Sequence, residues 1–142
     1  MAQMIFSYFP FPIRDPQTGE VKKELYRPII PIKICYKHQF LPYTINCLLD
    51  SGSDRNLFPA FLGEKIGIKI KKGIPQKIGG IGKSQINGFS HNIKIFVGNL
   101  SLLTKIDFSY EHEIPILGRN GFFNLFKGVI FKEKEKVVIL KR

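Results

Sequence analysis

The sequence contains no tryptophan, only two cysteines and no long apolar run, and these shortages exclude whole classes of protein. None of its apolar stretches approaches the roughly 18 consecutive residues that a membrane-spanning helix needs. The apolar N-terminus is interrupted by Pro10, Pro12 and Arg14 and has no basic start, so we interpret it as folded structure rather than a signal peptide. We therefore expect a cytoplasmic protein with no membrane partner.

The few cysteines and histidines form no pattern typical of a metal site or a disulfide framework. Cys35 and Cys47 lie in predicted strands without Cys-x-x-Cys spacing, which favours reduced thiols in the core, while pairing across a hairpin stays open. His38, His91 and His112 are isolated and lack the paired spacing of metal ligands, so surface or hydrogen-bonded histidines are the simpler interpretation. We expect no metal and no cofactor.

Acidic residues are scarce, with 11 Asp and Glu against 22 Lys and Arg, which leaves a net charge of +11. Clustered basic residues would favour a nucleic-acid partner, because they displace counterions from phosphates. Here the lysines are spread along the chain, and the densest group, residues 132–136, alternates with Glu133 and Glu135. A solvated basic surface is therefore favoured over nucleic-acid binding, and a preference for acidic partners stays open.

The distribution of apolar residues predicts an all-β fold in a single domain of residues 1–142. Short apolar or alternating stretches are separated by Gly, Pro and Asn, which is typical of a closed or partly open β-barrel or of a sandwich. The strands are predicted over residues 6–13, 20–27, 29–36, 44–49, 128–131 and 137–140, with a long hairpin over residues 68–94. The turn signal of residues 15–19 makes the first two strands an N-terminal hairpin extension of about residues 1–25. Two short helices are predicted, over residues 59–66 and 120–126.

Residues 48–52, Leu-Leu-Asp-Ser-Gly, are the strongest candidate for an active site. An apolar strand that ends in Asp50 holds one carboxylate rigidly and partly buried, and the small residues Ser51 and Gly52 allow another backbone or a substrate to approach. Asp, Ser and Gly are also common turn residues, so the tripeptide alone is compatible with an ordinary turn. A second motif, Ile-Leu-Gly-Arg-Asn at residues 116–120, lies far downstream.

Four segments, in this order, resemble the retropepsin-like (retroviral-type) aspartic proteases. Residues 27–34 resemble the first barrel strand, residues 47–54 the catalytic loop, residues 77–82 the tip of the flap hairpin, and residues 116–120 the strand and turn that support the active site. The longer terminal segments are more similar to the stand-alone bacterial members than to the minimal viral enzymes. The resemblance implies a β-barrel of the retropepsin (acid protease) type with a flap hairpin and one or two short helices.

The resemblance further implies an aspartic endopeptidase. In this chemistry a water molecule lies between two carboxylates, one ionised to accept its proton and one protonated to donate to the scissile carbonyl. Two carboxylates a few Å apart resist ionising together, which is a known property of aspartic proteases. Because the chain has one Asp-Ser-Gly only, the second Asp50 must come from another copy. The implied partners are therefore a second copy, in a homodimer, and a peptide or protein substrate.

The resemblance also assigns roles to individual residues. The catalytic set is Asp50, Ser51 and Gly52, in which the hydroxyl of Ser51 bonds across to the other loop. The implied substrate-binding residues are Leu48, Asp54, Ile78, Gly79, Gly80, Ile81, Ile114 and Ile116. The apolar side chains among them favour hydrophobic residues at the cut. For Leu48 and Ile116, a purely structural role in the core is an equal alternative.

Arg119, Gly118 and Arg27 are implied to support the site rather than to act in catalysis. By resemblance, Arg119 pairs with Asp54 and stiffens the catalytic loop. Arg27 corresponds to the family's other interface arginine, which reaches Asp54 of the partner subunit.

Other functions stay open at this level. A catalytically silent peptide-binding or dimerisation module of the same fold would not need the Asp-Ser-Gly set and the flap glycines. A phosphate-binding glycine loop at residues 78–82 would need a following helix, and residues 83–88 are a poor helix start. A nucleic-acid-binding barrel would lose its ligand with rising salt. A serine hydrolase would need a Gly-x-Ser-x-Gly motif, which the chain lacks.

Overall fold

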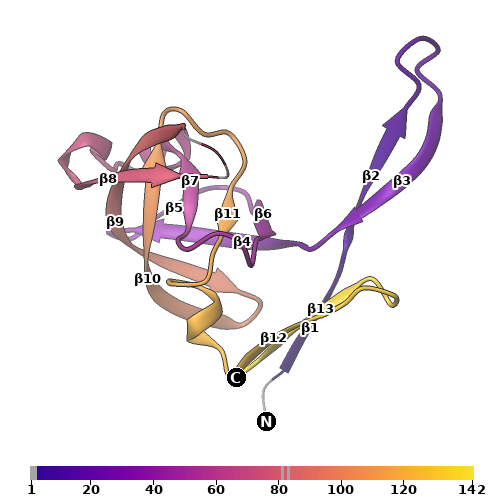
Figure 1. Cartoon of the computed structure of the whole chain (residues 1–142). Helices are drawn as coiled ribbons and strands as arrows, with labels where there is room; N and C mark the ends of the chain where they lie inside the picture. Colours follow the sequence, from indigo (N-terminus) through magenta and orange to yellow (C-terminus); the bar gives the residue numbers. More distant parts are fainter. Residues whose placement is uncertain (1–2, 81, 83) are drawn as a thin grey trace.

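A closed barrel of strands forms the body of the molecule, and a small sheet and a long hairpin extend from it (Figure 1). The computed structural model describes residues 3–80, 82 and 84–142. Among these residues are thirteen strands, one short α-helix and two 3₁₀ helices. The chain is therefore mainly β, as its apolar pattern predicts.

The barrel arises from one eight-stranded sheet in which the second strand from one end pairs with the second strand from the other. Its strands are β4 (Ile29–Tyr36), β5 (Gln39–Phe40), β6 (Ile45–Leu49), β7 (Leu57–Pro59), β8 (Ile74–Gly79), β9 (Gln85–Val97), β10 (Leu100–Ser109) and β11 (Ile116–Leu117). They follow the order β5-β4-β6-β11-β7-β10-β9-β8, and β4 also pairs with β9. This extra pairing closes six of them into a barrel and leaves β8 attached through β9 alone.

Strand alternation explains why these segments close around a core. In β4, Ile30, Ile32 and Ile34 are fully buried, while Pro31 and Lys33 between them are exposed, because successive side chains of a strand point to opposite faces. The facing strands β9 and β10 contribute further buried side chains, among them Ile95 and Phe108.

The two predicted helices are shorter than expected. The α-helix α1 (Ala60–Glu64) begins directly after Pro59, as predicted, but its last turn tightens into bonds of the 3₁₀ type and ends before residue 66. The predicted helix over residues 120–126 is wrong: only a 3₁₀ turn, η2 (Phe123–Leu125), forms there. Asn120 cannot start a helix because its backbone is held in a β-bridge with Arg55. The predicted hairpin over residues 68–94 also begins later, after the 3₁₀ turn η1 (Ile70–Lys72).

Both chain termini contribute to one small sheet. Its strands are β1 (Gln3–Ser7), β12 (Gly128–Lys132) and β13 (Val137–Lys141), in the order β1-β13-β12. Val138 and Leu140 of β13 are buried in the main core, together with Tyr8, so this sheet packs on the barrel. The last two strands confirm the predicted C-terminal hairpin.

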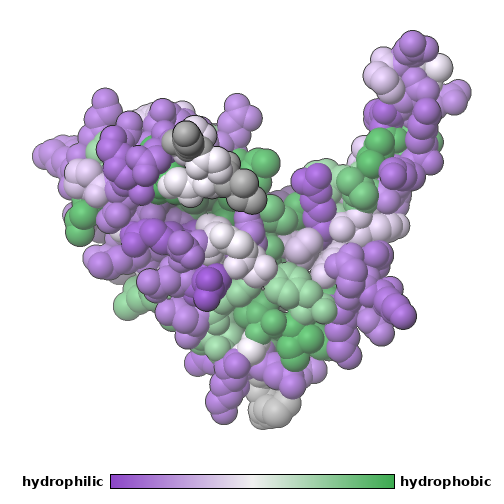
Figure 2. Space-filling view, in the orientation of Figure 1, coloured by the Kyte–Doolittle hydropathy of each residue, from purple (hydrophilic) through white to green (hydrophobic). Residues whose placement is uncertain are grey.

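The N-terminal hairpin has other bounds than predicted. Its strands are β2 (Phe9–Arg14) and β3 (Val21–Arg27), while Phe6, which was predicted in its first strand, lies in β1 opposite Val138. Residues 9–27, which we call the arm, project away from the body as a separate ribbon (Figures 1 and 2). Arg27 is the last residue of the arm and not part of the first barrel strand.

The two cysteines are both buried free thiols. Cys35 lies opposite Phe40 and Cys47 opposite Ile30, so the cross-hairpin pairing that the sequence left open is not formed between them. Burial raises the pKa of the Cys47 thiol well above its usual value. Among the described residues, no helix combines the length and apolarity that crossing a membrane demands.

Candidate active site

Asp50 lies at the end of β6, where hydrogen bonds from neighbouring segments fix its backbone. Its N–H donates to the carbonyl oxygen of Leu117 at 3.0 Å, and its carbonyl oxygen accepts from the N–H of Ser53 at 3.1 Å. Leu49, the residue before it, donates to the carbonyl oxygen of Pro28 at 2.9 Å. The carboxylate is therefore carried by a strand in the middle of the sheet and has little freedom to move.

The Asp50 carboxylate is half-buried and accepts a hydrogen bond from its own loop. The N–H of Gly52 donates to Oδ1 of Asp50 at 2.9 Å. A Cβ atom at position 52 would come within 3.2 Å of the same oxygen, closer than most real contacts of this kind. Glycine thus lets the backbone approach the carboxylate and leaves the space in front of it open.

A cavity of about 410 Å³ opens in front of Asp50, between its loop and the β8–β9 hairpin. Of the residues predicted from the sequence, it brings together Asp50, Gly52, Ile78, Gly79, Gly80 and Ile116. Its other lining residues, which sequence reasoning missed, are Ser53, Leu57, Ser84, Ile86 and His112. Its size lies within the range of small-molecule and peptide side-chain sites, and its walls are mainly aliphatic.

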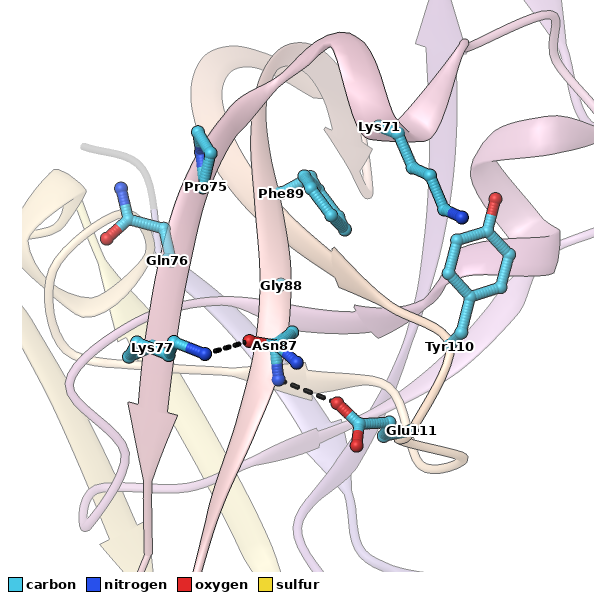
Figure 3. A pocket seen from close by; sticks show the side chains of 9 residues that line it. All are labelled: Lys71, Pro75, Gln76, Lys77, Asn87, Gly88, Phe89, Tyr110 and Glu111. Atoms are coloured by element: carbon cyan, nitrogen blue, oxygen red, sulfur yellow. Dashed lines mark hydrogen bonds between the residues drawn. The ribbon is translucent and has the colours of Figure 1, made fainter.

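The two faces of the β8–β9 hairpin have different surroundings. Ile78 pairs with Ile86, and both line the Asp50 cavity. Lys77 and Asn87, the next pair, point to the other face because side chains alternate along a strand. There they line a second cavity with Phe89 (Figure 3).

Side chains from the end of β10 hold the base of this hairpin. The β9–β10 ladder ends at the pair of Phe89 and Phe108. Beyond it, the backbone N–H of Asn87 donates to the Glu111 carboxylate at 2.7 Å (Figure 3), and the carbonyl oxygen of Asn87 accepts from the Ser109 hydroxyl at 2.6 Å. These two side chains take the place of the missing strand pairs.

The predicted ion pair of Arg119 with Asp54 is present but weak. Nη1 of Arg119 lies 3.9 Å from Oδ1 of Asp54, and the two side chains are 68% and 89% exposed. Exposed pairs of this kind contribute little to stability. Backbone hydrogen bonds connect the two segments more firmly. The N–H of Arg119 donates to the carbonyl oxygen of Ser53 at 2.8 Å, and the N–H of Asn120 donates to the carbonyl oxygen of Asp54 at 2.9 Å.

A stronger ion pair, which the sequence did not indicate, lies beside the loop. Arg55 donates from two nitrogens to the carboxylate of Asp107, which is 1% exposed. Hydrogen bonding to Asp107 raises the pKa of Arg55, against the opposing effect of burial. The sequence did contain a signal for this pair, because Asp107 lies between Ile106 and Phe108 in an apolar strand. A buried carboxylate in such a strand needs a cation beside it.

Buried Asn56 connects three segments behind the loop and was also missed. Its amide nitrogen donates to the carbonyl oxygen of Lys105 at 3.0 Å, and its amide oxygen accepts from the N–H of Gly118 at 2.9 Å. Gly118 packs directly on the backbone of Arg55, where a side chain would have no room. Gly118 is thus in close backbone contact with the segment that follows the Asp50 loop.

Several predicted residues lie away from the cavity. Ser51 and Ile114 are exposed, Asp54 faces solvent near Arg119, and Leu48 sits between Ile29 and Ile116 in the sheet. Arg27 stacks over the ring of Phe11 within the arm, at 5.3 Å from the ring centre. Ile81 lies outside the described residues.

His91 and His112 are hydrogen-bonded, which agrees with the interpretation made from their isolation. Nε2 of His91 lies 2.8 Å from the carbonyl oxygen of Ile70, and Nε2 of His112 contacts the carbonyl oxygen of Ile114. His112 is also the nearest imidazole to the candidate site, because it lines the Asp50 cavity.

Comparison with known proteins finds likeness in structure and not in sequence. No family model and no curated protein sequence matches the chain. A retropepsin-like aspartic protease from Rickettsia conorii superposes with a TM-score of 0.62 at 14% identity, over 98% of this chain and 89% of the other. EIAV protease, in a complex with the inhibitor HBY-793, gives a TM-score of 0.48 at 22% identity, over 72% of this chain and 88% of the other. The first likeness shows a shared fold, and the predicted retropepsin-like β-barrel is thereby confirmed.

Proposed function

From a retropepsin-like fold that holds one Asp-Ser-Gly loop, we propose that the chain is an aspartic endopeptidase which acts as a homodimer. The observation that carries the proposal is the Asp50 carboxylate, oriented by the Gly52 N–H at the mouth of an aliphatic cavity under the β8–β9 hairpin. The Rickettsia protease with the same fold supports it. The proposed substrate is a peptide or a protein.

The reaction needs two carboxylates, of which each chain supplies one. The ionised Asp50 takes a proton from water while the water oxygen bonds to the scissile carbon. Asp50 of the partner subunit donates its proton to the carbonyl oxygen, which gives a neutral diol. The carbon–nitrogen bond then breaks. The leaving nitrogen takes a proton from the first carboxyl group, and one diol hydroxyl returns its proton to the second.

The proposed roles of the surrounding residues follow from their places. Ile78, Gly79 and Gly80 belong to a flap that closes over the substrate, and the exposed hydroxyl of Ser51 bonds to the second loop. Ile78 and Ile116, with Leu57 and Ile86, form an aliphatic wall, so we propose cleavage between hydrophobic residues.

Four further residues keep the roles that the resemblance implies. Leu48, Ile114 and Asp54 would meet substrate only once a second copy completes the site, and the amide of Ile81 would bind substrate carbonyl groups through a water molecule. Arg119 supports the loop mainly through its backbone, since its ion pair is exposed.

Mapping of cleavages in a diverse peptide library by mass spectrometry, from about pH 4 to pH 7, tests the function. The wild type should cut between hydrophobic residues, and Asp50→Asn should not. Glu135→Gln, in the charged turn between β12 and β13, is a matched loss of one carboxylate and should leave the cuts unchanged. A dimeric wild type that binds peptides without cutting them would establish a silent binding module instead.

A further inference from the structure

The arm is the one part of the described chain whose apolar side chains have no core beneath them. Every residue of β3 is exposed, and so is every residue of β2 except the partly buried Ile13. Phe9, Phe11, Leu25 and Tyr26 are each 37–43% exposed. A two-stranded hairpin is marginally stable alone in water, so this ribbon lacks the support that the barrel strands have.

Most of the large apolar side chains of the arm share one face. Antiparallel pairs share a face, and the register pairs Phe9 with Arg27, Phe11 with Leu25, and Ile13 with Lys23. Those three pairs lie on the same side because they alternate with the pairs of Pro10 with Tyr26 and Pro12 with Glu24. The first side therefore carries four apolar side chains, and we call it the apolar face of the arm.

Several contacts within the arm restrict its conformation. Oδ1 of Asp15 accepts from the N–H groups of Gln17 and Thr18, and its Oδ2 lies 3.3 Å from Nζ of Lys22. The rings of Phe9 and Phe11 are in tilted contact with centres 5.4 Å apart, and the Arg27 guanidinium covers Phe11. A ribbon restricted in this way loses less conformational freedom on binding than an unstructured loop of the same length.

The root of the arm is next to the candidate catalytic loop. Arg27 is followed by Pro28, whose carbonyl oxygen accepts from the N–H of Leu49, the residue before Asp50. If two Asp50 carboxylates meet across a two-fold axis, the root of each arm lies close to that axis. The second copy then fills the open notch between barrel and arm that Figure 2 shows.

The charges of the arm nearly cancel over the whole ribbon, although the two charged residues on its apolar face, Lys23 and Arg27, are both basic. Its basic residues, Arg14, Lys22, Lys23 and Arg27, are nearly balanced by its acidic residues, Asp15, Glu20 and Glu24. The whole chain carries a net charge of +11, so two bodies repel each other at low salt. The ribbon as a whole adds little to this repulsion, but the two cations on its apolar face need acidic or aromatic partners on the second copy.

We propose that the apolar face of the arm packs on the body of a second copy, so that each chain of the homodimer clasps the other. The inference rests on the proposed function for the position of the two-fold axis, but the unsupported apolar face is observed independently. Pro10 and Pro12 cannot donate to a sheet, so their positions turn away from β3 and leave the free edge of β2 poor in donors. The contact is therefore made by the face and not by adding a strand at that edge.

Sedimentation equilibrium of the full chain tests the contact. The triple variant Phe9→Ser/Phe11→Ser/Leu25→Ser should raise the dimer dissociation constant at least about ten-fold, because central apolar contacts dominate interface energies. The double variant Glu24→Ser/Tyr26→Ser, on the opposite face, should change it less than about two-fold. Circular dichroism should show the barrel intact in both, and Phe11→Ser alone serves if the triple variant does not fold.

Photo-crosslinking locates the contact. A benzoylphenylalanine at position 25 should crosslink to barrel residues of a second copy, whereas one at position 26 should not. The clasp would be overturned if position 25 formed no crosslink to a second copy. It would also be overturned by a wild type that is monomeric at every concentration, or by a triple variant that dimerises like the wild type. Binding of the wild type to anionic vesicles instead of to itself would do the same.

The same samples separate this inference from the proposed function. If the triple variant loses the dimer while the dimeric wild type cuts no peptide, the proposed clasp is supported and the proposed protease activity is excluded. If the triple variant dimerises and cuts normally, the protease stands and the clasp does not.

Discussion

The β8–β9 hairpin and the β2–β3 arm are both long antiparallel ribbons, yet their surroundings differ completely. The first continues into the barrel through β9, carries Ile78 and Ile86 over the Asp50 cavity, and is held at its base by Glu111 and Ser109. The arm is held by its own turn and by the tilted contact of its Phe9 and Phe11 rings, and its apolar face is exposed. The first hairpin covers a cavity of its own body, whereas the apolar face of the arm is left exposed for the second copy that we propose.

The largest expected effect is on peptide cleavage, and it separates the role of Asp50, under the β8–β9 hairpin, from the role of the arm in dimerisation. Asp50→Asn should lower peptide cleavage by at least about 10³-fold, because each chain of the homodimer supplies one Asp50 and both carboxylates of the pair are lost. The same variant should dimerise like the wild type, since no arm residue changes. Cleavage assays and sedimentation of one sample check both. Residual cleavage at the wild-type rate would exclude Asp50 as a catalytic residue.

The next largest effect is on the free energy of unfolding, through the ion pair of Arg55 with Asp107 in β10. Arg55→Met should lower the free energy of unfolding by about 3 kcal/mol, because it leaves the buried Asp107 carboxylate without a cation. Adding Asp107→Leu should recover at least about half of this loss, since an apolar pair can replace a buried ion pair. Urea unfolding measures both. Equal stability of the wild type and Arg55→Met would show that the pair is dispensable.

A smaller effect concerns the base of the β8–β9 hairpin alone. Glu111→Ala should speed hydrogen exchange of the Asn87 amide about five-fold, which corresponds to about 1 kcal/mol for one lost hydrogen bond. The amides of the arm should keep their exchange rates. Glu113→Ala, an exposed acid two residues away, is the control. Faster exchange in both hairpins would mean that the two ribbons are coupled.

The smallest effect is confined to the tip of the arm. Hydrogen bonds from the N–H groups of Gln17 and Thr18, then Lys22, lower the pKa of Asp15. A lowered pKa in the folded state contributes stability above the pKa of the unfolded chain, and this stability is lost as the pH falls through the folded value. Acid should therefore shift the amide resonances of Gln17 and Thr18, and Asp15→Asn should abolish that titration. Glu20→Gln should leave it in place.

Much of the fold could be predicted because its signals are local. The alternation of residues 29–36, the apolar run before Asp50, and the two C-terminal strands each determine their own structure through neighbours in the sequence. The helix predicted over residues 120–126 failed for the opposite reason. Its first residue is held by Arg55, which is distant in sequence, and such a bridge outweighs a weak local preference.

The candidate site was predictable in part for the same reason. Asp50, Gly52, Ile78 and Ile116 come from recognisable segments and do meet at one cavity. His112 and the contacts of Asn56 depend on which strands become neighbours, and no short pattern encodes that. A turn signal likewise predicts a hairpin without indicating whether its faces will be covered.

The prolines of β2 have a consequence for how far self-association can proceed. A sheet-rich protein with an uncovered apolar ribbon risks growing into fibrils, since the open edge of one ribbon can template the next. Pro10 and Pro12 remove the donors that such growth requires, and the register shift between Ile13 and Arg14 disturbs the edge further. A continuous cross-β stack needs both edges of the ribbon, so blocking the β2 edge prevents open-ended growth even though the β3 edge keeps its backbone donors.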